Sequence, residues 1–217
     1  MDMKKYVAAF LITTLIFIIG LGVGFSFSES QIKAVGNRIS SLAFDVKSID
    51  MELQILKSVN NESACSYLEK RLPDLAKRKT ILAEKFNNAQ TEDNEQIKKE
   101  FVYSLVQYWT FLKLANEQCD IHQPIILFFF EKNDERSREQ GTVLDYWVYQ
   151  MNLHNESLSV FGFDTELDEP LVRLLKDVYH IENVPAVVLD GTAKNEFLDR
   201  SAVRLLLCES YNLSVCS

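Results

Sequence analysis

Four cysteines carry the most reactive side chains of this 217-residue chain, and their positions suggest two disulfides. Cys65 and Cys119 are equidistant from residue 92, within the polar run NAQTEDNE between two expected helices. Residues equidistant from the turn of an antiparallel helix pair lie level, so we predict a disulfide at the open end of this hairpin. A second disulfide, between Cys208 and Cys216, would tie the last helix to the tail. The alternative is four buried free thiols in a reducing compartment.

The charged run FFFEKNDERSREQG, residues 128–141, lies where an expected strand passes into a helix, a common place for chemistry in α/β domains. A serine nucleophile in this run would need a positioned base. The spacing of the three histidines does not bring them together, and no Cys or His pair has the spacing of metal ligands. We therefore predict no metal and no cofactor, and we expect Asp134 or Ser137 to be the N-cap of the helix.

The formal net charge is -8, and no basic block stands out. Binding to nucleic acid requires clustered Lys and Arg side chains that neutralise phosphates. We therefore exclude nucleic acid as a partner.

The N-terminal segment indicates a membrane anchor, because residues 6–28 are uncharged and long enough to cross a hydrocarbon core of roughly 30 Å. We predict a transmembrane signal anchor over residues 1–28; the alternative is a cleaved signal peptide, whose apolar region would be shorter. Lys4 and Lys5 favour a cytoplasmic N-terminus. The expected product is a single-pass membrane protein with the bulk of the chain extracytoplasmic.

Residues 29–120 show helical periodicity throughout. Apolar side chains recur at alternating spacings of three and four, typical of a coiled coil, at Ile32, Val35, Ile39, Leu42, Val46, Ile49, Leu53 and Leu56. Two further amphipathic stretches flank residue 92, and Pro73 should kink or restart the first of them. We predict a helical stalk of three helices, whose first seam is buried in its own bundle or in a homo-oligomer.

Residues 121–217 change to a mixed pattern, for which we predict an α/β fold with a mixed central sheet and helices on both faces. The expected strands are IILFFF, SLSVFGFD, VPAVVLDG and the short KNEFL. The expected helices are REQGTVLDYWVYQM, DEPLVRLLKDVYHI and SAVRLLLCE. The apolar stripe of the second helix is expected at Leu171, Leu174, Leu175 and Val178.

The C-terminal part, about residues 124–209, resembles the thioredoxin superfamily. The resemblance depends on the order of these elements, on Val184 and Pro185 in NVPAVVLDG after the helix LVRLLKDVYHIE, and on QG in REQG. It implies a cis-proline at Pro185 and a loop that holds an extended peptide by backbone pairing. It also implies a cysteine pair near Asp134 and Ser137, where this chain has no cysteine.

We therefore expect a membrane-anchored, thioredoxin-like protein without the redox dithiol, which is a protein-binding, peptide-binding or scaffold module and not an enzyme. The alternative is a thiol-disulfide oxidoreductase that uses Cys208 and Cys216 or Cys65 and Cys119.

Overall fold

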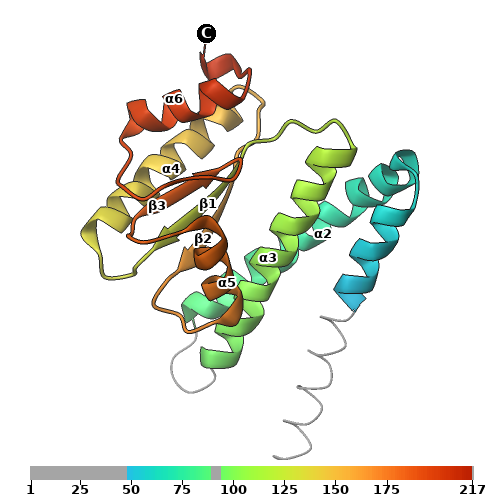
Figure 1. The fold of residues 1–217 in the computed structure, drawn as a ribbon, viewed down its shortest axis with the longest axis horizontal. Coiled ribbons are helices and arrows are strands. Elements are labelled where there is room, and N and C mark those ends of the chain that lie inside the picture. The colour runs from blue at the N-terminus through green and yellow to red at the C-terminus, as the bar shows by residue number, and fades with distance from the viewer. Residues whose placement is uncertain (1–47, 89–93, 217) are drawn as a thin grey trace, which may run out of the picture. The chain divides into compact units, whose positions relative to one another are not determined.

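The computed structural model describes residues 48–88 and 94–216. The chain forms two compact units, Met1–Leu56 and Lys57–Ser217. In the described part of the first unit, residues 48–56 are helical. The second unit contains two long helices, a small sheet and the helices around it (Figure 1).

Helices α2 (Asn61–Asn88) and α3 (Asn94–Gln118) form an antiparallel hairpin. The Cα atoms of Cys65 and Cys119 are 5.4 Å apart at its open end, and these residues form the disulfide expected between them. Toward the closed end, the rings of Phe86 and Phe101 stack with centroids 5.5 Å apart. Helix α2 continues through Pro73, so the helix does not restart there, and the alternative of a kink at Pro73 stays a prediction.

The sheet has four strands in the order β2-β1-β3-β4. Their bounds are β1 (Ile125–Phe130), β2 (Ser159–Asp164), β3 (Ala186–Leu189) and β4 (Thr192–Lys194). Strand β2 is parallel to β1, whereas β3 is antiparallel to both β1 and β4. The central strands β1 and β3 are almost continuously apolar because both of their faces are covered.

The remaining elements are α4 (Glu135–Leu153), α5 (Pro170–Tyr179), α6 (Arg200–Ser210) and the short 3-10 helix η1 (Ser214–Cys216). Successive β1 side chains enter different core clusters, as the two-residue period of a strand requires. Leu127 and Phe129 pack with side chains of α3 and α5. Ile126 and Phe128 pack with side chains of α4 and α6 on the other face.

This arrangement corrects the predicted fold class, an α/β domain preceded by a helical stalk and a transmembrane helix. The described residues are mostly helical, and the mixed sheet is small. Helix α3 also contributes to the core of the sheet, because Val102, Leu105 and Leu112 are buried against its strands. The physical reason is coverage: α5 has only 10 residues, and the apolar face of the sheet requires a longer helix beside it.

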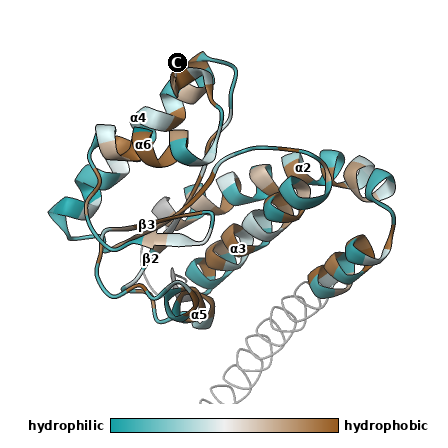
Figure 2. Cartoon of the chain, turned by 45° about the horizontal axis from the view of Figure 1, so that its top comes forward, coloured by the Kyte–Doolittle hydropathy of each residue, from teal (hydrophilic) through white to brown (hydrophobic). Residues whose placement is uncertain are grey.

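The predicted membrane span, residues 6–28, lies outside the described residues. Within residues 48–88 and 94–216, no helix combines the length and apolar character needed to cross a membrane. Hydrophilic and hydrophobic residues are interspersed along α2 and α3 (Figure 2). The described residues thus contradict the predictions of a transmembrane helix, a membrane partner and a single-pass localisation as far as they extend, because none of their helices could serve as the span. The stalk seam falls largely within residues 29–47, also outside that part.

Two local predictions also need correction. The fourth strand is Thr192–Lys194 instead of KNEFL, because Asp190 and Gly191 form a two-residue turn that brings Thr192 opposite Leu189. Both turn residues have positive φ, as the common type I′ hairpin requires. On α5, Leu174 and Val178 of the expected stripe are 54% and 57% exposed, whereas Leu175 is buried as expected and the other buried side chain is Val172.

Candidate functional site

Two loops meet at the carboxyl end of β1. Strand β1 ends at Phe130, and residues 131–134 lead from it into α4. Ala186 at the start of β3 pairs with Phe129, so the Val184–Pro185 segment lies at this same end of the sheet. We call this region the cis-proline end and define it by residues 131–137, Asp164, Val184 and Pro185. The positions that the resemblance singled out are thus brought to one end of the sheet.

Asp134 is the N-cap residue of α4. It has extended backbone geometry, and its carboxylate accepts a hydrogen bond from the Ser137 backbone N–H at 2.7 Å. Hydrogen bonds from the Ser137 side chain and backbone hold the pKa of this carboxyl below its ordinary value. An ionised cap is also favourable at the positive end of a helix. Asp134 therefore has a structural role at the start of α4.

Ser137 is buried behind this cap, with only 3% of its surface exposed. Its Oγ accepts a hydrogen bond from the Glu131 backbone N–H at 3.3 Å, which ties the β1–α4 loop to the helix. None of its contacts within the described residues involves a histidine. His154 caps the end of α4, and His180 caps the end of α5. Ser137 therefore has neither the access nor the base that a nucleophile needs.

The Val184–Pro185 peptide bond is cis. Pro185 is buried, whereas Val184 is half-buried against the core cluster that contains Phe129. The N–H and C=O groups of Val184 make no hydrogen bond to any residue in the described ranges. Buried or half-buried peptide groups usually have a partner, so these two are available to a bound chain.

The loop that carries Val184 is anchored at its start. The Ile181 N–H donates to the Lys176 carbonyl at 2.9 Å, which closes the end of α5. The Asn195 side chain donates to the His180 carbonyl at 3.1 Å. His180 itself has a left-handed backbone conformation, with φ at 52°. The free peptide groups of Val184 thus belong to a loop with a defined entry and to a segment that continues directly into β3.

Asp164, at the end of β2, is a residue of this region that the sequence reasoning missed. It pairs with Phe130, so it lies at the same end of the sheet. Burial raises the pKa of its carboxyl, although a hydrogen bond from the Glu166 N–H opposes the shift. Parallel pairing of the first two strands could have pointed to Asp164, because the carboxyl ends of neighbouring parallel strands lie together.

The four cysteines lie on other elements. Cys65 and Cys119 join α2 to the end of α3, and Cys208 and Cys216 join α6 to η1 with Cα atoms 5.7 Å apart. No free cysteine is found in the described ranges. A search of the same residues finds no group of three or more His, Cys, Asp or Glu side chains arranged to hold a metal ion.

Comparisons with known proteins give no family assignment. No family model matches the chain, and no curated protein matches it. The chain is similar to a solved structure titled "Structure of a malarial protein", with 17% sequence identity. The match covers 42% of this chain and 100% of the other, with a TM-score of 0.34. A likeness at that level carries no argument about fold or function.

Proposed function

We propose that this chain is related to thioredoxin-like proteins without a dithiol, and that its cis-proline end binds an extended peptide segment of a partner protein. The observation that carries the proposal is the free backbone of Val184, whose N–H and C=O groups have no partner among the described residues. A bound strand would supply an acceptor and a donor to these groups. Peptide recognition by strand addition uses such main-chain pairing for affinity and side-chain pockets for specificity.

The surroundings of Val184 suit recognition better than chemistry. Asp134 caps α4 and Ser137 holds the β1–α4 loop, so neither side chain is free to attack a substrate. Glu182 and Asn183, which precede Val184, are exposed and provide polar side chains beside the free peptide groups. This supports a surface that selects its ligand without altering it.

The test uses the full chain with its disulfides intact and a linear peptide selected from a random phage-displayed library. Affinity for the synthetic, fluorescein-labelled peptide is measured by fluorescence anisotropy. In a scan, one backbone N–H of the peptide is methylated at a time. We expect one position at which affinity falls about tenfold, because the methyl group removes a backbone hydrogen bond and prevents the two chains from approaching closely there. Control peptides carry the added methyl group on a side-chain carbon of the same residue, so they keep its backbone N–H.

A second measurement locates the site. Amide hydrogen exchange of Val184, followed by NMR, should slow when the peptide binds, whereas exchange of the Tyr149 amide, within α4, should not change. Equal affinity across the methylation scan, or unchanged exchange at Val184, would contradict the proposal. Reduction of insulin by the wild-type chain would favour the oxidoreductase alternative instead.

A further inference from the structure

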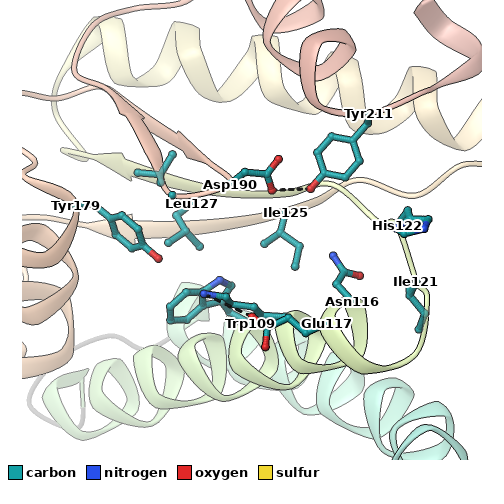
Figure 3. A pocket seen from close by; sticks show the side chains of 13 residues that line it. Trp109, Asn116, Glu117, Ile121, His122, Ile125, Leu127, Tyr179, Asp190 and Tyr211 are labelled. Carbon is teal, nitrogen blue, oxygen red and sulfur yellow. Dashed lines mark hydrogen bonds and ion pairs between the residues drawn. The ribbon is translucent and has the colours of Figure 1, made fainter. Parts of the chain in front are cut away.

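A cavity lies at the end of the sheet opposite the cis-proline end, near the start of β1. It has a volume of about 400 Å³ and opens between the C-terminal half of α3 and the sheet (Figure 3). Cavities that bind small molecules typically measure about 300–1,000 Å³. We call it the Trp109 pocket and define it by Trp109, Ile125, Leu127, Tyr179, Val188, Asp190 and Tyr211. It shares no residue with the cis-proline end.

The Trp109 pocket combines an aliphatic floor with aromatic walls. Ile125, Leu127 and Val188 come from the two central strands and form the floor. Three aromatic side chains come from separate segments: Trp109 from α3, Tyr179 from the end of α5, and Tyr211 from the residue after α6. Such a lining favours a planar, largely apolar ligand, because aromatic rings bury large areas and prefer stacked or edge-to-face neighbours.

Two hydrogen-bond donors in the walls have no acceptor. The Trp109 indole N–H and the Tyr179 hydroxyl make no hydrogen bond to any residue within 48–88 and 94–216. Both side chains are partly buried against the core of the sheet, so they are held in place. In Figure 3 the Tyr179 hydroxyl points toward the space above Trp109. An acceptor on a ligand in the cavity would provide a partner for each donor.

The charges at the rim largely compensate one another. Lys113 and Glu117 lie one turn apart on α3, and both side chains are more than half exposed. The Lys113 Nζ and Glu117 Oε1 atoms are 3.9 Å apart. The Asp190 carboxylate accepts a hydrogen bond from the Tyr211 hydroxyl at 2.7 Å, which also fixes the ring of Tyr211 in the wall. Among the described residues that line the cavity, Lys113 pairs with Glu117 and His122 with Asp120, so an anionic ligand would lie near Asp190 without compensation. A neutral ligand fits this lining best.

We propose that the Trp109 pocket binds a neutral, planar aromatic molecule that carries a hydrogen-bond acceptor such as a carbonyl. The aliphatic floor and the aromatic walls enclose its ring system. The Trp109 N–H and the Tyr179 O–H donate to its acceptor. The site does not depend on peptide binding at the cis-proline end.

The test uses two probes of nearly equal shape, 2-acetylnaphthalene and 2-ethylnaphthalene, with the full oxidised chain. The chain has two tryptophans, so an NMR spectrum of the indole N–H groups contains two signals, and Trp147→Phe identifies that of Trp109. Trp147 is a suitable reference because its N–H already donates to the Arg200 carbonyl at 3.1 Å in the other core cluster. We expect the acetyl probe to shift the Trp109 signal downfield and to bind about tenfold more tightly than the ethyl probe.

Matched variants test the two donors. Trp109→Phe and Tyr179→Phe each keep a ring and remove one donor, so each should weaken the acetyl probe severalfold and leave the ethyl probe nearly unchanged. Tyr149→Phe, at a side chain that is 60% exposed on α4, is the control and should change neither affinity. Binding of both probes with equal affinity, or no shift of the Trp109 signal with either, would overturn the proposal.

Discussion

The two ends of the sheet present different kinds of surface, although they share the strands β1 and β3. At the cis-proline end the side chains of Asp134 and Ser137 are hydrogen-bonded around the start of α4, and the backbone of Val184 has no partner among the described residues. In the Trp109 pocket the backbone pairs in the β3–β4 hairpin, and side-chain donors are free. This difference underlies the two proposals, a polypeptide ligand at one end and a small molecule at the other.

The largest expected effect tests whether both ends depend on one shared core. Phe129 is fully buried in β1 and pairs with Ala186, next to Pro185. Phe129→Ala should lower the free energy of unfolding by about 4 kcal/mol, because it leaves a cavity among packed rings. Urea denaturation measures this change, and Tyr149→Ala at an exposed position should change it little. An equally small effect of both substitutions would contradict the shared core.

The next largest effect compares the loss of each disulfide, because only one of the two disulfides closes a loop that contains a residue of the Trp109 pocket. Cys65–Cys119 closes a loop with a sequence separation of 54, and the double substitution to Ser should cost about 4 kcal/mol. Cys208–Cys216 has a separation of 8, so its loss should cost less, and Tyr211 lies inside its loop. We expect the second double variant to weaken 2-acetylnaphthalene binding more than the first. Thermal unfolding and the probe titration measure the two effects, and the reverse ranking in the titration would be inconsistent with this role of Tyr211.

A smaller effect concerns the alkaline side of the pH range and the Trp109 pocket. Burial, followed by the hydrogen bond to Asp190, raises the pKa of Tyr211 above its ordinary value of 10.0. Stability that this group contributes is therefore present below the unfolded pKa of about 10 and is lost as pH rises through the folded pKa. Tyr211→Phe should lower stability by about 1 kcal/mol at neutral pH and flatten the alkaline decline. Urea unfolding at several pH values tests this; identical pH profiles would contradict it.

The smallest effect is expected on the acid side, at the cis-proline end. The pKa of Asp134 is lowered in the folded chain from its ordinary value of 3.8, so its contribution is present above that pH and is lost as pH falls through the folded pKa. Asp134→Asn keeps the cap but removes the titration, so stability should fall less steeply below pH of about 4 than in the wild type. Asp164, at the same end, has its pKa raised and is unchanged in both chains. A parallel acid decline in the two proteins would exclude the ionised cap.

The sequence was informative where local patterns decide the structure. The apolar run IILFFF, the acids before α4, and the symmetric placement of Cys65 and Cys119 each correspond to an observed element, cap or disulfide. A turn at Asp190 and Gly191 was also predicted at the end of the third strand, where Asp-Gly is a strong hairpin signal, but the next strand was expected at KNEFL instead of Thr192–Lys194. The free backbone of Val184 could be expected from the resemblance but not from residue types.

The Trp109 pocket could not be predicted from the sequence. Trp109, Tyr179 and Tyr211 lie 70 and 32 positions apart along the chain, on three segments with separate periodicities. In the sequence, each of these residues has the pattern of an ordinary apolar or terminal position of its own helix. They line one cavity only because α3 packs on the sheet and the Tyr211 hydroxyl bonds to Asp190.

The sequence alone thus determined the order of strands and helices, the capped start of α4 and the absence of a dithiol there, because these depend on neighbours within a few residues. Tertiary structure decided which face of α5 is buried, that α3 completes the core of the sheet, and which side chains surround the Trp109 pocket. The physical reason is that hydrophobic burial is not directional: an apolar stripe must be covered, but the stripe does not specify which segment covers it.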